Sequence, residues 1–204
     1  MRKIHRLLSS CRRGYFKYLY LCTLNHKIRK IRRKETIRVL FAVAESATWK
    51  NDSLYRAMLM HPGFTPLILV LPDEQKEESL KWEGVDTCFD FFRNKGYTCS
   101  YPYENGKLIN IRKALNPDII FYQKPYTYYP ESFLYRRNLN ALFCYTNYAF
   151  HSLLADWANK NDFFQLVWQN YYENESGFTD LKRKYPEAAS NIVVTGLPLS
   201  LIHI

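Results

Sequence analysis

Apolar residues are gathered in five short runs along the chain. They occupy residues 37–44, 67–71, 118–122, 141–145 and 192–195. The runs are continuous, rich in Ile, Val, Leu and Phe, and do not alternate with polar positions, which is typical of strands buried on both faces of a parallel sheet. A weaker pattern predicts a further strand at 97–101. No Asn-Gly turn joins consecutive predicted strands, so we expect no hairpin between them.

Segments with apolar residues at helical spacing lie between these runs. The predicted helices are 52–61, 85–94, 110–115, 130–138 and 179–184, whereas 163–172 fits either a strand or a helix. Buried strands that alternate with helices predict an α/β fold with an open, doubly wound parallel sheet. In such sheets, ligands bind beyond the carboxyl ends of the strands. The loops at 45–52, 123–129 and 146–151 are therefore the candidate binding loops.

The first of these loops offers acids, a hydroxyl group and a tryptophan. Glu45 and Asp52 are candidate catalytic carboxylates, and Ser46 and Trp49 are candidate substrate contacts. We expect partial burial to raise the pKa of Glu45 and so to suit it as a base. An exposed indole ring stacks on the C–H faces of a sugar while carboxylates accept hydrogen bonds from its hydroxyl groups. The alternative interpretation is a helix cap with a Trp that packs against the core.

The other two loops add amide, amine, phenol and imidazole groups. Gln123, Lys124 and Tyr126 follow the apolar run at 118–122, and Tyr148 and His151 follow the run at 141–145. Lysine binds phosphate as a point charge, and histidine is a general base near neutral pH. The alternatives are a tyrosine-rich surface loop and a structural histidine.

The charge of the chain is concentrated at its beginning. The formal net charge is +10, and residues 1–34 hold twelve Lys and Arg and no acid. Apolar and aromatic residues form a helical stripe among these bases, which predicts a helical arm that packs little against the body and lies on an anionic membrane surface. A nucleic-acid-binding arm and a solvated extension are the alternatives. The apolar stretch at 14–24 is too short and too interrupted to span a bilayer.

Several common sites are absent from the sequence. There is neither a GxGxxG fingerprint nor a P-loop, and no Ser/His/Asp spacing supports a hydrolase triad. The five cysteines form no CxxC pair, so we expect a reducing compartment and no zinc site.

Five segments resemble the first half of bacterial GT-B glycosyltransferases, and most of all the CDP-glycerol glycerophosphotransferase-like family. They are IRVLFAVAESATWKNDSLYRAM, FTPLILVLP, LNPDIIFYQKPY, ALFCYTNYAF and NIVVTGLP, and together they cover about residues 37–198. The resemblance implies a Rossmann-like acceptor-side domain at 35–198, with the nucleotide-activated donor bound mostly by a second domain. It also implies that no metal or cofactor is bound. Members of this family carry a His-Gly motif after a strand, whereas His151 here has no glycine beside it.

The resemblance also implies a function. It predicts an N-terminal fragment, inactive alone, of a transferase that moves a glycosyl or glycerophosphate group to a membrane-borne acceptor. Such an enzyme serves cell-wall, capsule or teichoic-acid-type synthesis at the inner face of the bacterial membrane. Residues 199–204 match a peptide encoded by a sequencing adapter, so we expect a non-native tail at a truncation point. A genuine apolar C-terminal tail is the alternative.

Two other classes of function stay open. One is an α/β module whose basic arm contacts nucleic acid. Residues 35–204 carry seventeen bases against nineteen acids, which argues against a basic binding face on the body. We therefore expect no nucleic-acid partner. A non-catalytic interaction domain is the third class.

Overall fold

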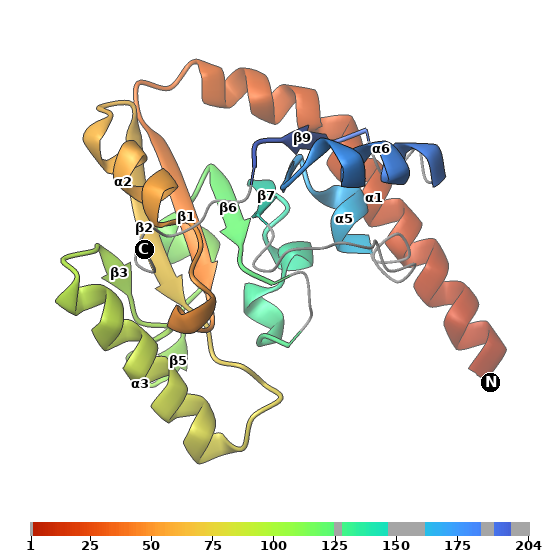
Figure 1. Ribbon diagram of the computed structural model, residues 1–204. Coiled ribbons are helices and arrows are strands. Elements are labelled where there is room, and N and C mark those ends of the chain that lie inside the picture. The colour runs from red at the N-terminus through yellow and green to blue at the C-terminus, as the bar shows by residue number, and fades with distance from the viewer. Residues whose placement is uncertain (1, 125–127, 147–161, 185–189, 197–204) are drawn as a thin grey trace.

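A parallel sheet forms the centre of the protein. The computed structural model describes residues 2–124, 128–146, 162–184 and 190–196. Within these residues seven strands pair in one sheet, and every pairing is parallel. The strands are β1 (Ile37–Val43), β2 (Phe64–Val70), β3 (Cys99–Ser100), β6 (Ile119–Tyr122), β7 (Leu142–Thr146), β8 (Gln169–Tyr172) and β9 (Ile192–Val194). The predicted open α/β sheet is therefore confirmed (Figure 1).

All five apolar runs form strands, and the weaker pattern at 97–101 contains the short strand β3. The ambiguous segment 163–172 divides into a helical turn, α5 (Asp162–Leu166), and strand β8. Strand β8 has the sequence QNYY, and it lies between β7 and β9. The sequence pattern left this segment open between strand and helix because polar Gln169 and Asn170 interrupt the apolar signal.

The order of the strands reverses at the centre of the sheet. From β1 the chain moves outward through β2 to β3, and from β6 it moves outward in the other direction to β9. Strands β1 and β6 lie side by side, with Ala42 opposite Tyr122 near their carboxyl ends. Loops that leave these two ends turn to opposite sides, and this is where open α/β sheets bind ligands.

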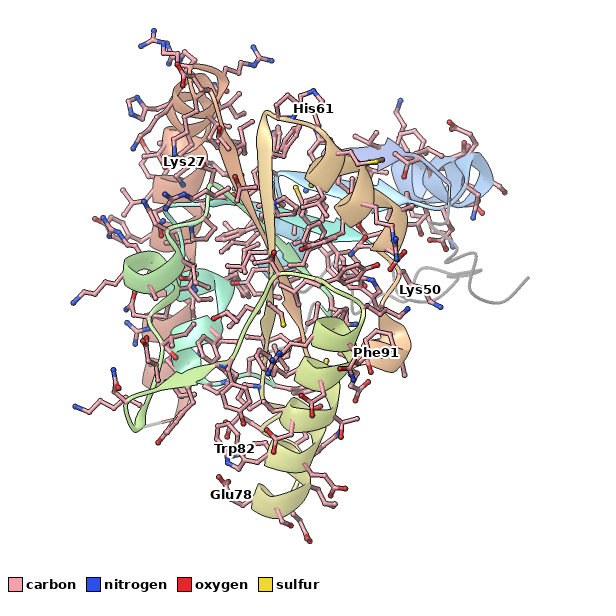
Figure 2. All side chains as sticks on the ribbon, turned by 90° about the vertical axis from the view of Figure 1, so that its left-hand side faces the viewer. Lys27, Lys50, His61, Glu78, Trp82 and Phe91 are labelled. Atoms are coloured by element: carbon pink, nitrogen blue, oxygen red, sulfur yellow. The ribbon has the colours of Figure 1, made fainter. Side chains whose placement is uncertain are left out.

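Helices cover both faces of the sheet. One face packs against α2 (Asp52–Met60) and α3 (Glu78–Asn94), and its core includes Phe41, Tyr55 and Phe92. The other face packs against α1 (Arg2–Arg32), α5, and two short turns, η3 (Glu131–Phe133) and η4 (Tyr135–Arg137). Figure 2 shows the two sides, with Lys27 on α1 and with Glu78, Trp82 and Phe91 on α3.

Three local predictions need correction. Residues 130–138 form the turns η3 and η4 in place of one helix, and 110–115 forms a single π-type turn, η2 (Ile111–Leu115). A small hairpin also exists, since β4 (Tyr103–Glu104) pairs antiparallel with β5 (Lys107–Leu108). Asn105 and Gly106 join these strands with φ of 51° and 76°, the conformation that an Asn-Gly hairpin turn requires. Two further helices extend the predicted ranges, because α3 begins at Glu78 and α6 (Glu175–Lys184) begins before residue 179.

The N-terminal segment is helical as predicted, but the expectation that it packs little against the body is wrong. Tyr20 is 1% exposed, its ring stacks on Phe143 of β7 with a centroid distance of 5.1 Å, and Phe143 N donates to its hydroxyl oxygen. Ile31 is also buried, and Lys34 forms an ion pair with Asp118 at the start of β6. Among the described helices, none combines the length and the apolar character that crossing a bilayer requires.

Candidate functional site

Three loops meet at the carboxyl edge of the sheet, around the end of β1. Glu45 lies in the loop after β1, Gln123 and Lys124 follow β6, and Lys76 belongs to the loop after β2. The last of these loops is tied to the chain after β6, because Glu74 N donates a hydrogen bond of 2.7 Å to Tyr128 O. We call Glu45, Lys76, Gln123 and Lys124 the strand-end cluster. The candidate loops at 45–52 and 123–129 therefore meet at this edge, whereas residues 147–151 of the third candidate loop lie outside the described residues.

Gln123 joins the two central strands at the point where they part. Its side chain is 4% exposed, and its Oε1 accepts hydrogen bonds from Ala44 N at 3.0 Å and Glu45 N at 3.2 Å. Its Nε2 donates to Glu45 O at 2.7 Å. The amide thus takes the place of the next backbone pair between β1 and β6, and it satisfies peptide groups that burial would otherwise leave unpaired.

The Glu45 carboxylate lies between two lysines. Lys124 Nζ donates to Glu45 Oε2 at 3.0 Å, and Lys76 Nζ lies 3.6 Å from Glu45 Oε1. The hydrogen bond from Lys124, reinforced by the charges of both lysines, holds the pKa of Glu45 below its ordinary value despite partial burial. The expectation that partial burial raises the pKa of Glu45 is therefore wrong. Glu45 is ionised at neutral pH and is a weaker proton acceptor than an isolated carboxylate.

Trp49 is not an exposed stacking platform. It is 4% exposed and packs at ring-centroid distances of 5.5 Å from Phe41 and 5.2 Å from Phe92. Its Nε1 donates to Asp52 Oδ1 at 3.3 Å. The packing alternative therefore describes this residue correctly, because the loop after β1 turns the indole ring under α2 and away from the solvent.

Asp52 is the first residue of α2 and belongs to a hydrogen-bonded network with neighbouring elements. Tyr97 OH donates to Asp52 Oδ1, and Arg56 Nε donates to Asp52 Oδ2 at 2.9 Å. Burial alone would raise the pKa of Asp52, but the hydrogen bonds from Tyr97, Arg56 and Trp49 outweigh it and lower the pKa. These contacts tie α2 to the chain that enters β3 and give Asp52 a structural role. Its catalytic assignment stays a prediction.

Of the remaining predicted site residues, Ser46 is among the described residues and three others are not. Ser46 is half-buried beside Glu45, and its carbonyl oxygen accepts from Trp49 N at 3.1 Å within the turn η1 (Ser46–Thr48). Tyr126, Tyr148 and His151 lie outside the described residues. Their assignment to the site stays a prediction.

Sequence reasoning missed two residues at this edge of the sheet. Lys76 lies in an acidic segment whose composition is typical of a solvated loop, so it was not identified as a site residue. It is the one base between residues 73 and 80. Glu173 directly follows β8 and is 7% exposed. Glu173 could have been identified as an acid that directly follows a strand, but the sequence left 163–172 open between strand and helix.

A third strand end adds an unusual polar group. Thr146 is the last residue of β7. The residue before it, Tyr145, is paired with Tyr122 of β6. The Thr146 side chain is 7% exposed, and its Oγ1 has no hydrogen-bond partner among the described residues.

The strand-end cluster favours anionic or hydroxyl-rich ligands. Two lysines and one glutamate carry a net charge of +1, and lysine interacts with phosphate groups as a compact cation. Glu45, while ionised, accepts hydrogen bonds from hydroxyl groups. The arrangement can therefore bind a phosphorylated or polyhydroxylated molecule at the end of β1.

We expect Gln123→Leu to lower the free energy of unfolding by about 2–3 kcal/mol, because it leaves the buried Ala44 N–H unpaired while preserving the side-chain volume. Urea denaturation measures this loss. Gln75→Leu is the matched control, since Gln75 is exposed, and it should change stability by less than about 0.5 kcal/mol. An equal effect of both substitutions would contradict the bridging role of Gln123.

Comparison with known proteins identifies a fold and no family. No protein-family model matches the sequence, and no curated protein matches it. The fold is similar to the crystal structure of UDP-N-acetylglucosamine 2-epimerase, with a TM-score of 0.50 over 79% of this chain and 13% sequence identity. The chain spans about half of that protein, covering 48% of its length. At this identity the likeness concerns the fold alone. It supports a GT-B-like, Rossmann-like α/β fold and does not single out the glycerophosphotransferase family.

Proposed function

We propose that this chain is the acceptor-side part of an enzyme that uses a nucleotide-activated sugar or polyol. In this proposal, the enzyme transfers a glycosyl or glycerophosphate group to an acceptor bound at the carboxyl edge of the sheet. The observation that carries the proposal is the strand-end cluster, which lies where the strand order reverses. The similarity to a UDP-N-acetylglucosamine 2-epimerase supports a nucleotide sugar as the class of donor.

The members of the cluster have different roles in this proposal. Lys124 and Lys76 attract a phosphate group on the acceptor, and Glu45 accepts a hydrogen bond from an acceptor hydroxyl. Gln123 holds the backbone of Glu45 and so fixes the position of its carboxylate. These groups bind and orient the acceptor hydroxyl, which is the positioning contribution to a transfer reaction.

The transfer also requires a general base, and the electrostatics favour His151 over Glu45 for this role. The pKa of Glu45 is lowered by Lys124, which weakens the carboxylate as a proton acceptor. The ordinary pKa of histidine lies close to neutrality. His151 stays the predicted base, with Tyr126 and Tyr148 as predicted acceptor contacts, and most of the donor contacts are assigned to a second domain.

Glycerol 3-phosphate should bind to the chain as it stands and shift the backbone amide NMR signals of Glu45, Gln123 and Lys124. We expect Lys124→Gln to weaken this binding about tenfold, since a hydrogen bond to a charged group contributes about 1.5–3 kcal/mol. An NMR titration of the wild type and the variant measures both effects. N-acetylglucosamine, titrated in parallel, reports whether a neutral sugar binds at the same residues.

Lys107→Gln is the matched control, because it removes one exposed base from the β4–β5 hairpin. It should leave the affinity for glycerol 3-phosphate unchanged. The proposed site is rejected if neither ligand produces a saturable shift at the strand-end cluster, or if Lys107→Gln and Lys124→Gln weaken binding equally.

A further inference from the structure

Helix α1 has one side that belongs to the protein core. Tyr20 and Ile31 are buried, and Leu24 packs against both core clusters. Lys27 also turns toward the body, with its Nζ 3.9 Å above the ring of Tyr20, and burial lowers its pKa to about 8. These residues fix the rotation of α1 about its axis, so the opposite side of the helix must face outward.

The outward side begins with an apolar and aromatic surface. Tyr15 is 61% exposed, Tyr18 66%, Leu19 38% and Leu21 42%. Exposed side chains of this size in one helical segment are unusual on a protein surface that contacts only water, and such a patch marks an interaction site. Tyrosine in particular is favoured at the boundary between water and the lipid hydrocarbon.

A cationic surface follows on the same side of the helix. His26, Arg29, Lys30 and Arg33 recur at helical spacing and line an open groove of about 460 Å³. Their side chains are exposed. The outward side thus places aromatic and aliphatic groups next to a row of bases, which is the composition of helices that lie in a membrane interface.

We propose that the outward side of α1 binds the surface of a bilayer that contains anionic phospholipids. The bases attract the lipid phosphates, and Tyr15, Tyr18 and Leu21 enter the interface beside them. In Figure 1, α1 extends past the body at its N-terminal end. The proposal does not depend on the proposed transferase activity.

Charge favours a lipid surface over other partners. A protein that binds nucleic acid usually carries a basic face on its folded body. Here the residues outside 1–34 carry more acids than bases, so the basic surface is confined to α1. Pairing of α1 with a second copy would bring two segments of twelve bases together and is opposed by their repulsion. An anionic bilayer satisfies both the bases and the apolar groups.

The test is sedimentation of the full chain with vesicles of phosphatidylcholine alone or with about 30% phosphatidylglycerol. Binding should require the anionic lipid and should weaken as salt rises from about 0.05 to 0.5 M. We expect the triple substitution Arg29→Gln, Lys30→Gln, Arg33→Gln to lower the partition coefficient about 100-fold, because each base near the surface contributes roughly fivefold.

Two further variants separate the contributions to binding. The control triple Lys107→Gln, Arg112→Gln, Lys113→Gln removes the same charge from exposed positions outside α1 and should alter the partition coefficient less than about threefold. The pair Tyr18→Ser, Leu21→Ser should lower it about tenfold at low and high salt alike, because apolar burial is not screened. Deletion of residues 1–34 is not a suitable test, since it removes Tyr20 and Ile31 from the core.

Four results would overturn the proposal. They are equal binding to vesicles with and without anionic lipid, an equal loss in the two triple variants, tighter α1-dependent binding to RNA or DNA than to vesicles, and a dimer that the Tyr18→Ser, Leu21→Ser pair abolishes. Circular dichroism of each variant confirms that α1 remains helical. Retained helicity with selective loss of vesicle binding is the result that supports the proposal.

Discussion

The substitution Tyr20→Ala is expected to lower the free energy of unfolding by about 3–5 kcal/mol, the range for removing a buried aromatic ring. Tyr20 is 1% exposed, and its ring lies parallel to that of Phe143 with an interplanar angle of 4°. The substitution removes this stacking, leaves a cavity between α1 and β7, and deprives Phe143 N of the tyrosine oxygen that it donates to. Urea denaturation of the full chain measures the loss.

Two other tyrosine variants serve as controls for this result. Tyr18→Ala lies on the same helix but on its exposed side, and we expect a change of less than about 0.5 kcal/mol. Tyr20→Phe keeps the ring and loses only the hydroxyl group, which should cost about 1 kcal/mol. If Tyr20→Ala were as mild as Tyr18→Ala, α1 would be an appendage of the domain and not a part of its core.

The second large effect is expected at Trp49. Trp49→Ala should destabilise the protein by about 3–5 kcal/mol, because it removes the side chain that packs between Phe41, Tyr55 and Phe92. Trp49→Phe retains much of the apolar contact and should cost less. Thermal or urea denaturation followed by far-ultraviolet circular dichroism measures both, without relying on the fluorescence of the residue that is replaced.

Trp82 provides a matched comparison for Trp49. It lies on α3, is only half-buried, and its Nε1 donates to Glu78 Oε1 at 2.7 Å (Figure 2). Trp82→Ala should therefore destabilise by about 1 kcal/mol. A Trp49→Ala protein with wild-type stability and lost ligand affinity would restore the sugar-stacking interpretation. Equal losses of stability at Trp49 and Trp82 would contradict the burial difference between them.

The catalytic assignments show how neighbours decide the chemistry of a side chain. Glu45 and Asp52 are acids in the same short loop, and the sequence alone treats them alike. In the structure, Glu45 meets Lys124 from a loop 79 residues away, whereas Asp52 meets Tyr97 from a segment 45 residues away. Neither partner is adjacent in sequence, so no local pattern could have separated the strand-end residue from the structural one.

Much of the fold was determined by local sequence. A strand buried on both faces must be apolar at every position, so the runs at 37–44, 67–71 and 118–122 could be recognised without knowledge of their partners. The parallel arrangement and the positions of the binding loops follow from the alternation with helices. The concentration of bases in residues 1–34 is likewise a property of the sequence itself.

Tertiary structure decided the features that depend on contacts between distant segments. It packed Trp49 in the core, paired the Gln123 side chain with peptide groups that directly follow β1, and placed polar β8 between two apolar strands. It also rotated α1 so that Tyr20 packs inward while Tyr18 stays exposed. Side-chain periodicity shows that a helix has two sides, but the neighbouring surfaces determine which side is buried, because burial is a property of the whole packed molecule.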